Sequence, residues 1–361
     1  MQRRRWSVML KAACTVLAVT ALILPASASA HARPGGGPSS EPAAEVLLSG
    51  LSSPKGLAST LGGDLVIGQG AFGPPGPVLR FDRHKGTTTE LTGPRNVTDV
   101  ATGLDGSLWA IGNDLVLYRK GWFDEALEPV LDIAAYQQVD VDPFDIENNP
   151  TETNPFGLLV LPFGDALLVD AAGNDLIRVT PAGDAKTVAR WDVELVSTDH
   201  FPPAAGLPPM LPAEAVPTTV VLGKHGSVYV GDLKGFPFRP GSSRVWQVNP
   251  QAQDAVCSVN TPDDDCSVVA EGFTSVYDIA FDHWTQSLFV YELAQGGVLA
   301  FLAGQQTGDF PPSVLVKVKD GQRTVLADGL LSQAGGVTTH LGRVFVTDGT
   351  FTNGRLLKIQ H

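Results

Sequence analysis

Short apolar runs separated by turn residues dominate the chain from Glu45 onward. Many of these runs alternate apolar with polar side chains, and Gly, Pro, Asn or Asp punctuates them. Strands produce this alternation because successive side chains point to opposite faces of a sheet. No long stretch carries a convincing helical period. The pattern therefore predicts an all-β protein built from many short strands.

One motif recurs six times along the chain. It starts with a turn residue, glycine in most copies, continues with a run of β-formers, and usually ends on a carboxylate six residues later. The copies are residues 63–69, 106–112, 164–170, 226–232, 286–292 and 342–348. Self-similarity at a period of this order is typical of repeat architectures, so each copy is expected to be the second strand of one sheet.

The last repeat lacks a fourth strand before the chain ends at His361. The missing strand is matched near the other end, because residues 46–51 are similar to the fourth-strand segments 268–273 and 325–330. An N-terminal strand that completed the last blade would close the ring and remove exposed sheet edges. We therefore predict a six-bladed β-propeller over residues 45–361, with a two-sheet sandwich as the alternative.

The first thirty residues have the features of a secretory signal peptide. Basic residues precede an apolar run over residues 12–24, and Ala28-Ser29-Ala30 forms a small-residue cleavage site. Residues 31–44 are rich in Gly, Pro, Ser and Ala, as expected of a flexible tether. We expect cleavage after Ala30 and a secreted protein without a membrane span; an uncleaved anchor is the alternative.

The formal charge of the chain is −13. The signal peptide contains four basic residues and no acidic residue, so its removal changes the charge to −17. Such an acidic surface argues against nucleic acid as a partner. It is compatible with cationic ligands or cation binding without selecting either. We expect a monomer whose partner is a small molecule, a glycan or a protein.

Two cysteines, Cys257 and Cys266, remain after the signal peptide. In an oxidising compartment, a pair at this spacing predicts a disulfide that closes a loop. A redox role is disfavoured because the Cys-x-x-Cys spacing is missing.

In a propeller, the loops from second to third strands and those leading into the first strands lie on one face. Residues on such loops are frequent binding positions. The candidates at this channel mouth are Asn154, Asp170, Asp232, Glu292 and Asp348. The four carboxylates could supply oxygen ligands to calcium, although each could instead brace its own turn through backbone hydrogen bonds.

Two long insertions, residues 134–153 and 196–213, extend the same face. The first is rich in acidic residues, and the second contains His200, the one histidine expected there. A three-histidine zinc site is therefore excluded, whereas a general-base role for His200 stays open.

Several segments together resemble the ScyD/ScyE family of exported bacterial proteins. They are residues 51–57 (LSSPKGL), 148–150 (NNP), 154–158 (NPFGL), 170–179 (DAAGNDLIRV) and 290–292 (VYE). The resemblance covers nearly the whole mature chain. It implies a secreted propeller of poorly defined biochemical role and supplies no settled catalytic residues. The six-bladed layout is more distantly similar to NHL proteins and to calcium-dependent lactonases of the SMP-30/gluconolactonase type.

These observations support two functions. The first is a secreted propeller that binds a small molecule, glycan or protein at the channel mouth, because no nucleophile–base set is recognisable. The second is a calcium-dependent hydrolase of the lactonase or esterase type. A quinone-dependent sugar dehydrogenase is disfavoured because the expected His and Arg groups are missing from the candidate face.

Overall fold

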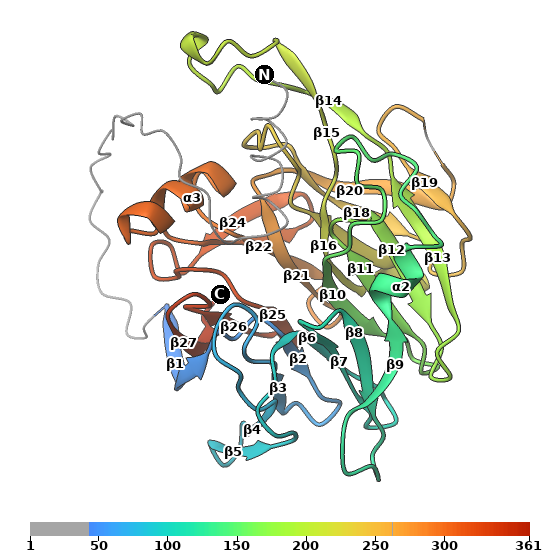
Figure 1. Cartoon of the computed structure of the whole chain (residues 1–361). Helices are drawn as coiled ribbons and strands as arrows, with labels where there is room; N and C mark the ends of the chain where they lie inside the picture. Colours follow the sequence, from blue (N-terminus) through green and yellow to red (C-terminus); the bar gives the residue numbers. More distant parts are fainter. Residues whose placement is uncertain (1–42, 262) are drawn as a thin grey trace.

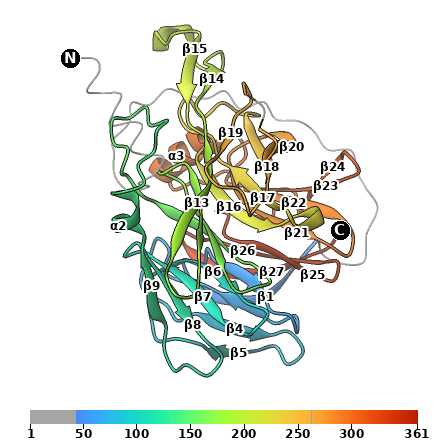
Figure 2. The same cartoon turned by 90° about the vertical axis from the view of Figure 1, so that its right-hand side faces the viewer.

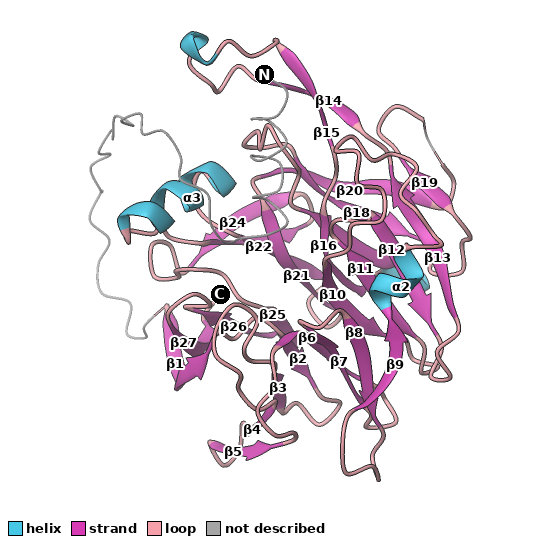
Figure 3. Ribbon diagram, viewed as in Figure 1, coloured by secondary structure: helices cyan, strands magenta, loops and turns pink. Residues whose placement is uncertain are grey.

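A computed structural model describes residues 43–261 and 263–361. Six sheets of antiparallel strands form the blades of a β-propeller (Figures 1 and 3). The six first strands contact one another in a closed ring, in the order β2, β6, β10, β16, β21, β25 and back to β2. The prediction of a six-bladed propeller is confirmed, and the sandwich alternative is wrong.

The first three blades follow one another along the chain, each with its first strand at the channel. Their strands are β2 (Leu57–Ser59), β3 (Leu65–Ile67), β4 (Leu79–Asp82) and β5 (Thr87–Glu90); β6 (Val97–Thr102), β7 (Leu108–Gly112), β8 (Val116–Lys120) and β9 (Glu128–Asp132); β10 (Pro155–Val160), β11 (Ala166–Asp170), β12 (Asp175–Val179) and β13 (Ala185–Trp191).

The remaining three blades repeat this order. Their strands are β16 (Pro217–Leu222), β17 (Val228–Asp232), β18 (Ser243–Val248) and β20 (Cys266–Phe273); β21 (Val276–Asp282), β22 (Ser287–Glu292), β23 (Val314–Lys319) and β24 (Gln322–Leu326); β25 (Val337–His340), β26 (Arg343–Asp348), β27 (Asn353–Ile359) and β1 (Ala44–Ser52).

The N-terminal strand β1 closes the sixth blade, as the sequence predicts. It pairs antiparallel with β27, with Ala44 opposite Ile359 and Ser52 opposite Asn353. The predicted signal peptide, residues 1–30, and nearly all of the predicted tether lie outside the described residues.

The second strands form the core between neighbouring blades. All residues of β7, β11 and β17 are buried, because each such strand is covered by a blade on either side. Burial on both faces explains why the repeated motif is a continuous apolar run, in contrast to the alternating third strands.

Three kinds of insertion interrupt the blades. The hairpin β14 (Glu194–Ser197) and β15 (Met210–Ala213), with the short helix η1 (Pro203–Ala205), extends away from the blades (Figures 1 and 2). Strand β19 (Ala255–Cys257) pairs in parallel with β13 as a fifth strand of blade 3. Besides η1, the helical segments of the described residues are α2 (Ile133–Gln137), η2 (Lys224–Gly226) and α3 (Gly297–Thr307).

Helix α3 was not predicted. It connects β22 to β23 and has a glycine at each end, Gly296 and Gly308, in the left-handed conformation. Its sequence, GVLAFLAGQQT, is apolar over most of its length and carries no charged residue, so no polar face marks a helical period. Val298 and Phe301 are buried in the core that α3 shares with blades 5 and 6.

Two faces of the propeller are distinguished below. The loop face is where second strands lead into third strands and where the chain reaches each first strand. The turn face is the opposite one, where first strands turn into second strands. Both chain ends of the described propeller reach the turn face, since the backbone N–H of Gln360 donates to the Ala43 carbonyl at 3.1 Å and the ring of His361 contacts the Gly342 carbonyl.

Candidate functional site

The loop face has a small apolar pocket at the mouth of the channel. The pocket has a volume of about 60 Å³ and residues of five blades line it. Phe72 and Phe351 stack at 4.8 Å between ring centroids, and Phe301 lies 5.1 Å from Phe351. The polar side chains in its lining are those of Asn154 and Thr218, besides the Tyr277 phenol. The pocket fits a small apolar group.

Asn154 is the one predicted site residue that lines this pocket. Its backbone N–H donates to Asp170 Oδ1 at 2.7 Å, and its carbonyl accepts from the Ala171 N–H at 3.0 Å. These bonds tie the start of β10 to the end of β11, so the sequence motif around Asn154 builds the pocket wall.

Asp170 is fully buried behind this wall. Its carboxylate accepts hydrogen bonds from four backbone or side-chain donors of its own blade, Thr153, Asn154, Ala172 and Gly173. Gln137 of α2 also donates to it, at 3.4 Å. Burial raises the pKa of Asp170, while these donors oppose the shift. A carboxylate bonded in this way braces its turn.

Asp232 belongs to a buried charge network. It accepts from the Arg244 N–H at 2.8 Å and from Trp246 Nε1 at 2.8 Å. Lys234 Nζ lies 3.6 Å from Asp232 and 3.2 Å from Glu194, which also pairs with Arg244 at 2.8 Å. Burial raises the Asp232 pKa against the effect of Lys234. The network links blade 4 to the start of the β14–β15 hairpin.

Glu292 and Asp348 are also bonded locally. Glu292 accepts from the Thr274 N–H at 2.8 Å, and Asp348 forms a two-bond ion pair with Arg355 of the adjacent strand. Burial raises the pKa of both carboxylates. Each of the four candidate calcium ligands thus has partners within or beside its own blade.

The part of the chain that the structure describes has no group of three or more His, Cys, Asp or Glu side chains suited to a metal ion. Calcium binding at Asp170, Asp232, Glu292 and Asp348 therefore stays a prediction.

His200 lies at the end of the β14–β15 hairpin, just before η1. Its Nε2 is 2.9 Å from the Pro237 carbonyl, and its ring lies 4.4 Å from that of Phe201. The neighbouring Asp199 forms an ion pair with Arg239 at 3.0 Å. These contacts attach the hairpin to the β17–β18 loop.

Two polar groups that were not predicted as site residues have strongly shifted pKa values. Glu214, which precedes β16 on the loop face, has a pKa of about 7 because of burial and its acidic neighbours Glu147 and Asp142. Asp99, in the channel, also has a pKa of about 7, mainly because of burial. Shifts of this size are frequent at functional sites.

Asp99 is part of a group in the channel that also contains Asp278 and Lys55. The two aspartates occupy equivalent positions in β6 and β21, and each accepts a backbone N–H of a neighbouring first strand: Leu158 at 2.8 Å and Val337 at 2.6 Å. Lys55 Nζ donates to the Phe156 carbonyl at 2.6 Å and lies 3.9 Å from the Phe156 ring centroid. The sequence signal that could have identified these two aspartates is their equivalent position in the first strands, in Val97-Thr-Asp99 and Val276-Tyr-Asp278.

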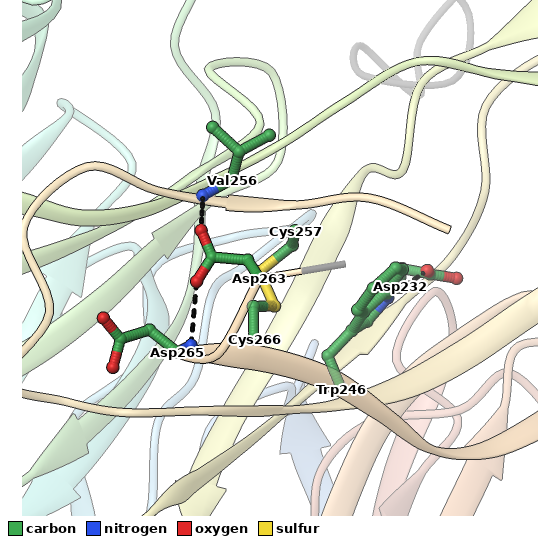
Figure 4. Close-up of a disulfide and its surroundings, with 7 residues drawn as sticks. All are labelled: Asp232, Trp246, Val256, Cys257, Asp263, Asp265 and Cys266. Carbon is green, nitrogen blue, oxygen red and sulfur yellow. Dashed lines mark hydrogen bonds between the residues drawn. A yellow bond between two sulfur atoms is a disulfide. The ribbon is translucent and has the colours of Figure 1, made fainter. Parts of the chain in front are cut away.

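The predicted disulfide between Cys257 and Cys266 is present, with Cα atoms 5.2 Å apart (Figure 4). Because β19 pairs with blade 3 and β20 with blade 4, the bond connects two blades. Asp263 supports the loop between them by accepting from the backbone N–H groups of Val256 and Asp265. This placement agrees with a structural role for the disulfide.

The chain matches no known protein-family profile and no curated protein sequence. Solved structures are similar in fold. Virginiamycin B lyase from Staphylococcus aureus superposes with a TM-score of 0.52 at 13% identity, over 88% of this chain and 99% of the lyase. A glucose dehydrogenase gives 0.53 at 14% identity, over 89% and 99%. A protein assigned as a gluconolactonase gives 0.53 at 11% identity, over 90% and 96%.

The solved structures that resemble this chain are six-bladed β-propellers of the gluconolactonase and virginiamycin B lyase type, which supports the propeller fold. At such low identity they show the fold alone, because one fold hosts many functions. Membership of the ScyD/ScyE family stays a prediction. No helix among the described residues is long and apolar enough to cross a membrane.

Proposed function

We propose that this protein is an exported binding protein that captures the apolar end of a small molecule at the loop-face mouth of its channel. The observation that carries the proposal is the contrast between two sets of residues there. The ring carboxylates are bonded within the blades, whereas Phe72, Phe301, Leu302 and Phe351 line a pocket between them. Binding sites of this kind are mostly apolar with a few polar groups.

The pocket wall favours an apolar group over the hydroxyl-rich surface of a glycan. Its aromatic rings offer stacking contacts, and the Asn154 amide offers one orienting polar group. The small volume admits only the end of a ligand, so the rest would lie over α3, whose Val298, Phe301 and Leu302 line the pocket.

Fluorescence titration with 1-anilinonaphthalene-8-sulfonate tests this proposal. We expect saturable binding that Phe351→Ser weakens about tenfold, as expected for the loss of one buried aromatic contact. Leu195→Ser is the matched control, because Leu195 is 66% exposed on β14. Equal binding by the wild type and Phe351→Ser would contradict the proposal.

A calcium-dependent hydrolase of the lactonase or esterase type is the second candidate. It is favoured by Glu214, a half-buried loop-face carboxyl with a pKa of about 7, which suits general acid–base catalysis. Calcium would then raise the melting temperature by mass action, and Glu214→Gln would abolish turnover of simple lactones. If calcium does not raise the melting temperature and no lactone is turned over, the hydrolase function is rejected and the binding function is retained.

A further inference from the structure

The turn face has a concentration of exposed apolar side chains around the other end of the channel. Five of them occupy turns between first and second strands and are called the apolar crown: Leu61, Leu104, Phe163, Trp284 and Leu341. Phe163 is 95% exposed and Trp284 75%. Trp122 and Phe123, on the β8–β9 turn, lie at the same end. Within the described residues, every Trp or Phe among the exposed large hydrophobic side chains is on this face.

The crown surrounds a cavity that is much larger than the loop-face pocket. The cavity has a volume of about 690 Å³ and is lined by the first strands of the blades. Four crown residues belong to its lining. Its size falls within the range of pockets that hold small-molecule ligands. Contiguous exposed apolar surface around a cavity is typical of a binding site.

The inner part of this cavity is acidic. Asp99 and Asp278 lie in this inner part, and Asp282 lies at the rim, where β21 ends. The lining includes no lysine or arginine. The histidines in the lining are His283 and His340, at the rim. Burial, with Arg83 and Arg343 nearby, lowers the pKa of His340, so this ring is uncharged at neutral pH.

Asp99 and Asp278 have hydrogen-bonding capacity beyond their contacts with neighbouring strands. Asp99 accepts from Val100 and Leu158, and Asp278 from Thr219, Ile279 and Val337. A carboxylate offers about four lone-pair sites. Both side chains are only partly buried and face the cavity.

Lys55 does not suit the cavity to an anion. It is 4% exposed, donates to the Phe156 carbonyl, and is absent from the cavity lining. Its charge acts on both Asp99 and Asp278, so this single cation offsets one of the two carboxylates and leaves the other for a ligand. A bare metal ion is equally disfavoured, because the described residues contain no group of three ligating side chains and the apolar crown would have no partner. The acidic inner part of the cavity matches a ligand with a cationic end, and the apolar rim matches an apolar part on the same ligand.

We propose that the turn-face cavity binds an apolar molecule that carries a protonated amine. The ammonium group lies between Asp99 and Asp278, and the apolar part lies against the crown. This site is separate from the loop-face pocket and does not depend on the function proposed above.

Isothermal titration calorimetry at pH 8 with three eight-carbon probes tests the charge preference. We expect saturable binding of n-octylamine, and binding of n-octanol and octanoate at least about tenfold weaker, because hydrogen bonds to a charged group are the stronger ones. Equal affinities for the amine and the alcohol would overturn the proposal, whatever the variants show.

Variants then separate the two parts of the site. Asp99→Asn/Asp278→Asn should abolish the preference for the amine and keep the weak binding of octanol. Trp284→Ser should weaken both, and Leu195→Ser, on the other face, should change neither. Unchanged amine binding in Trp284→Ser, or a retained preference in the double variant, would contradict the assignment.

Co-sedimentation with phosphatidylcholine vesicles tests the other use of such a crown, contact with a bilayer. We expect the protein to stay in the supernatant. Sedimentation that Trp284→Ser abolishes, combined with no saturable octylamine binding, would assign the crown to a membrane surface and overturn the proposal.

Discussion

The carboxylates of the loop-face ring and those of the channel differ in how completely the protein bonds them. Asp170 accepts from donors on both sides and is fully enclosed, whereas Asp99 is partly exposed to a cavity and is bonded by Val100 and Leu158. Both repeat from blade to blade, so repetition alone does not separate structural from functional residues. Structural and functional carboxylates are distinguished instead by how completely they are hydrogen-bonded and by their access to a cavity.

Removal of Asp170 should have the largest effect. Asp170→Ala leaves several buried N–H and O–H donors without an acceptor, which we expect to destabilise the fold by about 3–5 kcal/mol. Urea unfolding measures this loss. Asp328→Ala, at an exposed position, is the control and should change stability by no more than about 0.5 kcal/mol. A small loss of unfolding free energy for Asp170→Ala would show that Asp170 is not needed to brace its turn and would contradict the contrast with Asp99.

Lys55→Met should have the next largest effect. It removes the buried cation that faces Asp99 and Asp278, and we expect a loss of about 3 kcal/mol at pH 8. The loss should shrink at pH 5, where Asp99, with a pKa of about 7, takes up a proton. Thermal unfolding at both pH values tests this, with exposed Lys186→Met as control. A loss independent of pH would mean that Lys55 acts by packing alone.

Asp99 should make stability depend on pH. Its folded pKa of about 7 is above its unfolded value of about 4. The folded state therefore holds the proton more tightly, and its stabilising effect is lost as pH rises from about 4 to about 7. Asp99→Asn should flatten this decline by about 4 kcal/mol, at about 1.4 kcal/mol for each unit of the pKa difference. Urea unfolding across this pH range is the measurement, and an unchanged slope would place the titration elsewhere.

Asp175→Asn should have the smallest effect and the opposite sign to Asp170→Asn. Asp175 is fully buried beside Asp170, and burial raises its pKa well above the usual range. Gln137 Nε2 donates to its Oδ2 at 3.0 Å, while Asp175 Oδ1 and Gln137 Oε1 are both buried without a hydrogen-bond partner. An asparagine supplies the missing donor and no charge, so we expect a gain of about 1 kcal/mol at pH 8.

The raised pKa also determines how this gain varies with pH. Protonated Asp175 is neutral like asparagine, so the advantage of Asp175→Asn should decrease toward pH 4. Asp170→Asn should destabilise at pH 8, because it replaces one acceptor oxygen by a donor. Destabilisation by both substitutions would contradict the prediction, because it would show that the folded protein stabilises the Asp175 carboxylate instead of penalising its charge.

The propeller could be predicted because its signal is repeated. The run that ends at Asp170 is buried on both faces, and the copies that end at Asp232 and Asp348 follow the same rule. The sequence left open whether these carboxylates brace their own turns or bind a ligand, because their partners include Gln137 and Arg355, whose positions follow from tertiary packing. Helix α3 was missed because its sequence has no polar face.

The number of blades, the closure by β1 and the pairing of Cys257 with Cys266 follow from the sequence alone. They depend on the strand periodicity, on the repeated motif and on the short separation of the two cysteines. The tertiary fold is needed to see that this disulfide connects two blades, how the ring carboxylates are bonded, and that Leu61, Leu104 and Trp284 line one cavity. Such properties depend on which distant turns the ring brings together, and a turn's own sequence does not specify its neighbours.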